Sequence, residues 1–389
     1  MPLPGSTASG PLTRLRVLDI SAGLAGPFAA KLLADLGADV IRIEPPGQSA
    51  DDSAAATYTG TSKRSLTADL GRDEGRTLLF ELLRTHDIVI SSETEPALAA
   101  RGLGYSGLAA ANPRAILTTV TGFGSTGPYA GFASSHLVTC ALSGWANACG
   151  LPGREPIQAG GNVTEFVAGA YAAVGTLAAH EHRQRDGLGQ HVDVSAMEAA
   201  ITAALLPTMV YEYAGALPER NSVRTTGPSW MMECSDGYVG ANTLTQPQWE
   251  TMCHFLGLPE LLDEPAYATP AERLALATEL HARISPWFRE RSASEVFHDA
   301  QAWRIPFGLV PSLTDLLSME QLVDRQFFVQ LPDTTGRQVM VPGVPFRMPA
   351  SPSAPASPPR HGEHTEEVLT SLLGLSPAEV AALRAEGVC

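Results

Sequence analysis

The sequence predicts an α/β fold in which helices cover both faces of a parallel sheet, with a smaller second unit inserted in it. Apolar strands alternate with helices over the first 120 residues, which is typical of consecutive βαβ units. The chain has 389 residues, enough for two separate cores. A polar, turn-rich segment precedes a change of pattern, so we expect domains over residues 1–218 and 219–325, and a return to the first domain over residues 326–389.

The first βαβ unit is the clearest local pattern. A strand is predicted at residues 15–20, Pro27 suits the first position of a helix that ends before Gly37, and a strand follows at residues 40–43. Glu44 at the end of that strand would suit a dinucleotide site. The first glycine of the G-x-G-x-x-G fingerprint is missing, however, which argues against NAD.

Further elements follow in the same alternation. We predict helices at residues 73–84 and from His136, and strands at residues 86–90, 115–120 and 191–194. In the second unit we predict strands at residues 230–234 and 238–242, helices at residues 246–257, 271–289 and 292–301, and a strand at residues 304–311 that returns to the parallel sheet. A β-hairpin is expected within residues 332–349, before two C-terminal helices.

The longest helix is predicted from residue 163, and we expect it to be a core helix. Its apolar stripe, at steps of three and four residues, consists of Val163, Phe166, Val167, Ala170, Tyr171, Val174, Leu177 and Ala178. Asn162 is the expected N-cap and Glu165 falls at the third helical position, where the helix dipole favours an ionised carboxylate. Such a carboxylate acts as a nucleophile or a base, or forms only a capping box with Asn162.

Composition excludes several classes of function. The net charge of −15 argues against broad nucleic-acid binding and against docking on an anionic membrane. The five cysteines are widely spaced without a C-x-x-C pair, so neither a disulfide framework nor a metal site is indicated. With no signal sequence and no long apolar run, we expect a cytoplasmic protein.

A glycine-rich loop, TGFGSTGPY, follows the strand at residues 115–120. Ligands of parallel sheets bind at the carboxyl ends of strands, so backbone near Gly122 and Gly124 is a candidate binding surface. His136 lies at the start of the next helix. It is a candidate catalytic residue if it faces Glu165, and otherwise an ordinary surface or core histidine.

The order of these motifs resembles the class III coenzyme A transferases, the CaiB/BaiF family that includes formyl-CoA transferase and alpha-methylacyl-CoA racemase. The matching stretches span nearly the whole chain and include VLDISAGLAGPFAAKLLADLGADVIRIEPPG, SKRSLTADL, TGFGSTGPY, VTEFVAGAYAAVG, GQHVDVSAMEA, SDGYVG, RIPFGLVP and GEHTEEVL. The resemblance implies a Rossmann-like large domain made from both chain ends, an inserted small domain and a homodimer of interlocked rings.

The resemblance also implies a reaction. In transferases of this family an Asp stands where this chain has Glu165, and it attacks an acyl-CoA thioester to form a mixed anhydride and then an enzyme–CoA thioester. The substrates implied are therefore an acyl-CoA and a carboxylic acid. By the same resemblance, the expected CoA-binding residues are Gly23, Leu24, Ala25, Arg42, Pro45, Lys63, Arg64, Arg101, Gly122 and Gly124.

Several positions depart from the family pattern. Gly60-Thr61-Ser62 stand where an Asn-Arg-Gly-like segment is usual, and SETEPA at residues 92–97 replaces a Glu-Asn-Phe-Arg-Pro-Gly loop. The racemase branch uses a His and an Asp, and has a supporting Glu where this chain has Gln246; here Ser135 occupies the His position and His136 follows it. The alternatives to a transferase are thus an isomerase, epimerase or lyase that uses His136 and Glu165 as acid and base, or a family member that no longer uses CoA.

Overall fold

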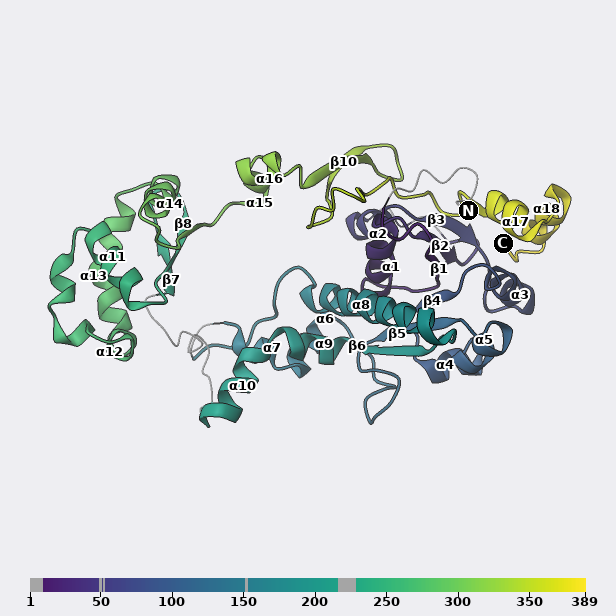
Figure 1. Ribbon diagram of the computed structural model, residues 1–389, viewed down its shortest axis with the longest axis horizontal. Helices are drawn as coiled ribbons and strands as arrows, with labels where there is room; N and C mark the ends of the chain where they lie inside the picture. The colour runs from purple at the N-terminus through teal and green to yellow at the C-terminus, as the bar shows by residue number, and fades with distance from the viewer. Residues whose placement is uncertain (1–9, 49–50, 52, 151–152, 216–228) are drawn as a thin grey trace. The chain divides into compact units, whose positions relative to one another are not determined.

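The computed structural model describes residues 10–48, 51, 53–150, 153–215 and 229–389 (Figure 1). These residues form two compact units. Unit 1 consists of the chain up to residue 149 with residues 156–205 and 324–389, and unit 2 consists of residues 150–155 and 206–323. The predicted boundary between residues 218 and 219 lies outside the described residues, and the three-part domain division stays a prediction.

Unit 1 is built around a six-stranded parallel sheet with the order β3-β2-β1-β4-β5-β6. The strands are β1 (Arg16–Asp19), β2 (Asp39–Glu44), β3 (Arg64–Thr67), β4 (Ile88–Ser91), β5 (Ile116–Thr121) and β6 (His191–Ser195). The strand order reverses between β1 and β4, where Val17 pairs with both Val40 and Ile88. Open parallel sheets bind their ligands at this point, beyond the carboxyl ends of the strands. The predicted α/β fold with a Rossmann-like parallel sheet is confirmed.

Helices cover both faces of this sheet. One face packs against α1 (Ala25–Asp35), α8 (Val163–Asp186) and α9 (Ala196–Ala203). The other packs against α3 (Asp73–Leu82), α4 (Glu95–Ala100), α5 (Tyr105–Ala111), α17 (Thr365–Leu373) and α18 (Pro377–Ala385). Figure 1 shows α17 and α18 beside α3, and Val368, Leu369 and Val380 are buried there. The chain's C-terminal segment therefore completes the core that its N-terminal segment begins.

The buried face of α8 differs from the predicted one. Tyr171 and Val174, expected in the core, are 42% and 62% exposed. The buried face instead carries small residues, and a Cβ on Gly169 would lie 2.4 Å from the carbonyl oxygen of Ala25. The two helices pack so closely that larger side chains do not fit between them. Part of the predicted apolar stripe, Val167 and Leu177, packs against the core from half-buried positions, whereas Tyr171 and Val174 face away from it.

Unit 2 contains a three-stranded antiparallel sheet of β7 (Ser229–Glu233), β8 (Tyr238–Asn242) and β9 (Gly308–Leu309). Its helices are α11 (Gln246–Phe255), α12 (Pro270–Ala275), α13 (Ala277–Arg289) and α14 (Ala293–Ala302). The predicted return of residues 304–311 to the parallel sheet is wrong, because β9 pairs with β8. Pro306 and Pro311 cannot donate to a ladder, which restricts this strand to two residues at a sheet edge.

The remaining elements connect or flank these layers. A hairpin forms, but earlier in the chain than predicted: β10 (Phe328–Pro332), which lies before the predicted range except for its last residue, pairs with β11 (Gln338–Pro342). The other helices are α2 (Ala54–Gly60), α6 (His136–Leu142), α7 (Trp145–Ala148), α10 (Leu205–Ala214), α15 (Leu313–Leu316), α16 (Glu320–Asp324) and the 3₁₀ helices at Pro259–Leu262 and Pro265–Tyr267. In the part of the chain that the structure describes, no helix combines the length and apolarity needed to cross a membrane.

Candidate active site

A cavity of about 350 Å³ lies in unit 1 at the point where the strand order reverses. It is bordered by the residues that follow β1, β4 and β5, and by the first turns of α1 and α8. Its lining residues are Ala22, Gly23, Leu24, Ala25, Ser92, Val120, Thr121, Gly122, Ser134, His136, Asn162, Glu165 and Ala196. A site here is expected for an open parallel sheet, because the connections on either side of β1 and β4 leave in opposite directions.

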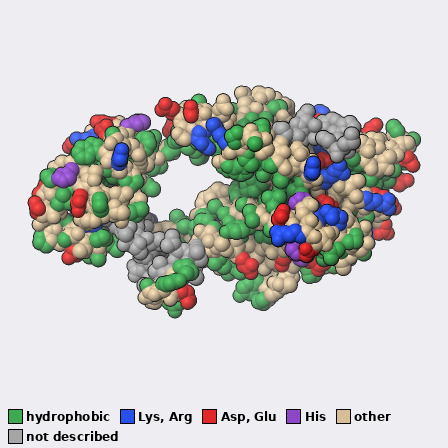
Figure 2. Space-filling model, in the orientation of Figure 1, with side chains coloured by type: hydrophobic (Ala, Val, Ile, Leu, Met, Phe, Trp, Pro, Cys, Tyr) green, Lys and Arg blue, Asp and Glu red, His purple; other side chains and the backbone are tan. Residues whose placement is uncertain are grey.

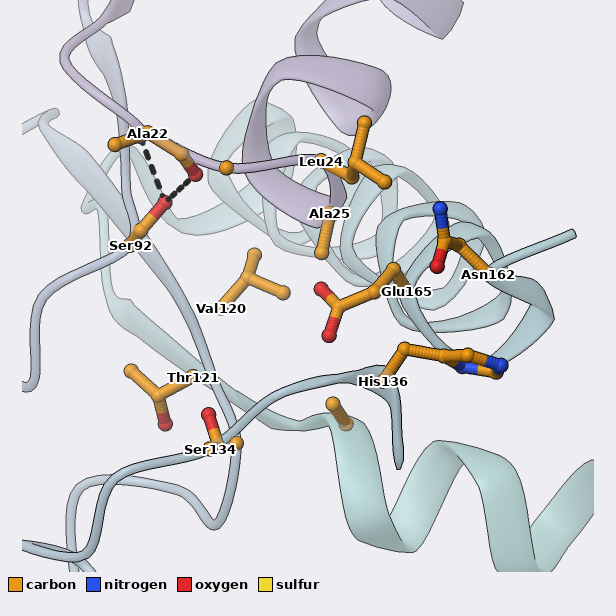
Figure 3. A pocket seen from close by; sticks show the side chains of 13 residues that line it. Ala22, Leu24, Ala25, Ser92, Val120, Thr121, Ser134, His136, Asn162 and Glu165 are labelled. Carbon is orange, nitrogen blue, oxygen red and sulfur yellow. Dashed lines mark hydrogen bonds between the residues drawn. The ribbon is translucent and has the colours of Figure 1, made fainter. Parts of the chain in front are cut away.

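Glu165 is the acidic residue of this cavity. It is the third residue of α8, and its carboxylate points into the cavity toward the side of Val120 and Ser134 (Figure 3). The side chain is half-buried, and among the described residues no hydrogen bond or ion pair to its carboxylate is found. Burial raises the pKa of Glu165 above its ordinary value, although His136 acts in the opposite direction. The carboxylate is thus partly shielded from water and, within the described part of the chain, bonded to no side chain, which favours reaction with an incoming group.

The start of α8 is not the predicted capping box. Asn162 is in the left-handed conformation, with φ of 52°, and its side chain accepts no capping hydrogen bond. The backbone N–H of Glu165 instead donates to the Asn162 carbonyl at 3.0 Å. The helix start was expected to favour the ionised carboxylate of Glu165; burial acts in the opposite direction and raises its pKa. Among the described residues, neither the Asn162 side chain nor a backbone N–H group at the start of α8 therefore donates a hydrogen bond to the carboxylate of Glu165.

His136 borders the same cavity but its ring is directed away from Glu165 (Figure 3). The Nδ1 atom lies 2.7 Å from Thr164 Oγ1 and the Nε2 atom lies 2.7 Å from the carbonyl oxygen of Ala159. Both ring nitrogens are therefore engaged with protein groups. An acid–base mechanism that pairs His136 with Glu165 requires a ring nitrogen facing the substrate, and this arrangement does not provide one.

Four of the predicted binding residues lie together at the cavity: Gly23, Leu24, Ala25 and Gly122. The Ser92 hydroxyl group donates to the Ala22 carbonyl at 2.7 Å and accepts from the Ala22 N–H at 2.9 Å, so it fixes the loop after β1. Ser92 was not predicted, although its place directly after β4 is the signal that could have identified it. Gly124 is not among the lining residues; it adopts φ of 83° beside the Asp193 carboxylate.

Pro45 and Arg101 lie at a second cavity of unit 1, of about 190 Å³. Ile20, directly after β1, and Glu93, two residues after β4, line it as well, so both cavities lie at the carboxyl ends of these two strands. An Nη1 atom of Arg101 binds the Glu93 carboxylate. The positive charge predicted to meet a CoA phosphate is thus shared with an acidic neighbour.

The other three predicted cations are paired elsewhere. Arg42 Nε lies 3.1 Å from Glu44, and Arg64 Nη2 contacts both carboxylate oxygens of Asp39 at 2.7 and 2.8 Å. Lys63 is fully buried, with its Nζ 2.7 Å from Asp19 Oδ2 and 2.8 Å from the Pro27 carbonyl oxygen. None of the three lines either of the two cavities described above. The ammonium group of Lys63 is therefore bound within the protein and lines neither cavity.

Surface charge is consistent with a small-molecule site. Acidic and basic side chains are interspersed on the face of the described residues shown in Figure 2. A polyanionic ligand would thus be recognised by single groups within a pocket.

Comparison with known proteins identifies the family. The family model "CoA-transferase family III" matches residues 12–365. The chain is 32% identical to the succinate–glutarate CoA-transferase of Agrobacterium fabrum, over 93% of this chain and 96% of the relative. It is 33% identical to the succinyl-CoA–D-citramalate CoA-transferase of Chloroflexus aurantiacus, over 97% of this chain and 98% of the relative.

Solved structures agree with this result. A CaiB/BaiF family protein from Brucella suis superposes with a TM-score of 0.82 at 27% identity, covering 94% of this chain and 100% of that one. A further relative, the formyl-CoA:oxalate CoA-transferase of Streptomyces avermitilis, is 30% identical over 97% of this chain and 99% of its own. The strand order, the cavity at its reversal point and these similarities lead to one conclusion: the chain belongs to CoA-transferase family III.

Proposed function

We propose that this enzyme transfers CoA from an acyl-CoA to an acceptor carboxylic acid, with Glu165 as the nucleophile. The observation that carries the proposal is the carboxylate of Glu165, which projects into the cavity at the carboxyl ends of β1, β4 and β5 and has no hydrogen-bonding partner among the residues that the structure describes. The relatives named above transfer CoA between small carboxylic acids, as their names state. A cavity of about 350 Å³ suits an acyl group of that size.

The proposed steps exchange one acyl bond at a time. A carboxylate oxygen of Glu165 attacks the thioester carbonyl, which forms a mixed anhydride and releases the CoA thiolate. The thiolate attacks the glutamyl carbonyl carbon and releases the donor acid, which leaves CoA bound to Glu165 as a thioester. The acceptor carboxylate then attacks that thioester, which forms a second anhydride and releases the CoA thiolate again. The thiolate attacks the acceptor's carbonyl carbon, so the new acyl-CoA leaves and the Glu165 carboxylate is restored.

The two adjoining cavities suggest how CoA binds. We place the thioester end beside Gly23, Leu24, Ala25 and Gly122, where exposed backbone allows close approach. The nucleotide end then extends toward the cavity that Pro45 and Arg101 border. Dinucleotides cross the reversal point of such sheets in a comparable way.

We further propose a homodimer in the cytoplasm. The apolar residues Tyr171 and Val174 of α8, and Leu137 and Leu142 of α6, remain exposed on unit 1. A solvent-facing apolar stripe on a helix this close to the site is typical of a surface that a second subunit covers. The interlocked arrangement expected for this family accounts for that surface.

Trapping of the glutamyl intermediate tests the function. Incubation with an acyl-CoA and hydroxylamine should convert the Glu165 side chain to its hydroxamate, which mass spectrometry of the peptide containing residue 165 detects. Succinyl-CoA and formyl-CoA are suitable first donors, because relatives use them by name. A panel of acyl-CoA donors that supports neither the hydroxamate nor transfer would refute the proposal.

The raised pKa of Glu165 predicts an acid limb in the pH dependence of transfer. The nucleophile must be ionised. The value of kcat/KM should therefore reach its maximum above the raised pKa and fall tenfold per pH unit below it. Since burial raises this pKa, the limb should lie above the ordinary glutamate value of about 4.3. The measurement is kcat/KM against pH in one buffer series. A limb at or below the ordinary value would contradict the proposed environment of the nucleophile.

Glu93→Gln is predicted to tighten CoA binding. The change removes a negative charge from the second cavity and releases Arg101 to meet a phosphate. Because both side chains are partly exposed, we expect an approximately fivefold lower Kd at low salt, and a smaller gain at high salt. Isothermal calorimetry with CoA measures the change. Glu81→Gln, which removes one acid from the exposed pair with Arg84, is the control and should leave Kd unchanged.

A further inference from the structure

The groups around His136 form a closed hydrogen-bonded network behind Glu165. His136 contacts Thr164 and the Ala159 carbonyl, each at 2.7 Å. Thr164 Oγ1 also lies 2.9 Å from Thr139 Oγ1, which lies 3.1 Å from the carbonyl oxygen of Ser135. Thr139 and Thr164 are fully buried and His136 nearly so. The network therefore links the start of α6 to residues on both sides of the turn that leads into α8.

This network persists whether His136 is neutral or charged. A carbonyl oxygen only accepts, so Nε2 donates to Ala159 in both states. In the neutral ring, Nδ1 accepts from the Thr164 hydroxyl group, which accepts from Thr139. In the charged ring, Nδ1 donates to Thr164, Thr164 donates to Thr139, and Thr139 donates to the Ser135 carbonyl. Rotation of two hydroxyl groups thus accommodates the proton, and neither state needs a substrate.

Something other than an N-cap must hold the turn before Glu165. Gly161 and Asn162 are both left-handed, and the Asn162 side chain makes no capping bond. His136 bonds the chain on either side of this turn, at Ala159 and at Thr164, the residue directly before Glu165. We propose that His136 is a positioning residue that clamps this turn and thereby sets the direction of the Glu165 carboxylate. It transfers no proton to or from the substrate.

The clamp rests on the proposed nucleophilic role of Glu165 and deepens it. A displacement of about 1 Å in a reacting group can lower the rate about a hundredfold. A turn without a side-chain cap is the part of α8 most able to move by that amount. His136 therefore acts on the rate through Glu165, not on the binding of CoA.

A double-mutant cycle on two partners of the clamp tests this. His136→Gln removes the ring and Thr164→Val removes the hydroxyl group at nearly constant volume. Each should lower kcat about 10- to 100-fold with KM for acyl-CoA little changed, and the double variant should be no slower than the slower single one. Thr176→Val is the matched control: Thr176 is a buried threonine of α8 that bonds Thr118 at 2.7 Å, away from the site. It should keep the wild-type kcat.

Two outcomes would overturn the clamp. If the losses of kcat in His136→Gln and Thr164→Val multiply in the double variant, the two residues act independently and His136 does not act through Thr164. Loss of a limb of the pH profile in His136→Gln, or α-proton exchange in D₂O that depends on His136, would mean that it transfers protons.

Amide hydrogen exchange gives a measurement that does not depend on activity. The amides of Glu165 and Phe166, which both donate to the Asn162 carbonyl, should exchange at least about tenfold faster in His136→Gln and in Thr164→Val, but not in Thr176→Val. Unchanged exchange in both clamp variants would refute the clamp even if transfer itself failed. Conversely, a wild-type enzyme that neither transfers CoA nor forms the hydroxamate would refute the proposed function alone.

Discussion

Glu165→Gln should abolish CoA transfer while leaving the fold intact. The amide keeps the shape of the side chain but cannot attack a thioester, so we expect kcat to fall by about 10⁴-fold and the hydroxamate to disappear. Stability should not fall with it. Because burial raises the pKa of Glu165, ionisation of the native side chain costs stability as pH rises through that pKa. The neutral amide avoids this cost, and thermal unfolding at neutral pH should show a Tm equal to or above that of the wild type.

The matched control is Glu198→Gln. Glu198 also stands third in its helix, α9, but its side chain is exposed and outside the cavity, so transfer should be unchanged. Glu165→Asp keeps a carboxylate on a side chain one methylene shorter. It should still give the hydroxamate, with transfer lowered about a hundredfold. Wild-type transfer by Glu165→Gln, or a large loss of stability with activity retained, would leave residue 165 with a structural role only.

Lys63→Met should strongly destabilise the protein. Lys63 and Asp19 form an ion pair with both side chains fully buried, and Asp19 also accepts hydrogen bonds from Ser21. Burial alone would raise the pKa of Asp19, but the charges of Lys63 and Arg42 and the hydrogen bonds hold it below its ordinary value. Removing the lysine leaves a buried carboxylate without a counter-charge, so the free energy of unfolding should fall by about 3–5 kcal/mol. Urea unfolding at neutral pH measures the loss.

The pH dependence and a second substitution check the cause. The ion pair's contribution is present above the ordinary aspartate pKa of about 3.9 and is lost as pH falls through the lowered pKa of Asp19. The difference in the free energy of unfolding between Lys63→Met and the wild type should therefore become smaller in acid. Asp19→Asn combined with Lys63→Met should recover part of the loss, because both charges are gone. A fully stable Lys63→Met that binds CoA weakly would instead support a phosphate contact.

Local patterns were sufficient to predict most of the secondary structure of unit 1. The strands β1, β2, β4, β5 and β6 lie within about two residues of their predicted positions, because short apolar runs between glycine and proline signals leave little alternative. The helix from Val163 was predicted as well, but it continues to Asp186 and buries a different face. Periodicity showed one apolar stripe; it could not show that Gly169 meets the Ala25 backbone.

The residues of the site divide in the same way. The identity of Glu165 as the acidic residue at a helix start, and its nearness to the glycine-containing turn after β1, follow from strand order and the resemblance to the family. The directions of the His136 ring and the Lys63 ammonium group could not be predicted from strand order or from the resemblance. Each is decided by partners far away in the chain, Ala159 and Thr164 for His136, and Asp19 for Lys63.

The sequence by itself determined the order of strands and helices along the chain, because that order depends on local spacing, and its motifs carried the resemblance to the family and the chemical group at position 165. Only the tertiary structure decided which polar groups are available to a ligand. Burial forces each polar side chain to find a partner, and that partner is set by three-dimensional proximity. The cations expected at the binding site are paired with carboxylates in this way, whereas Glu165 has no such partner among the described residues.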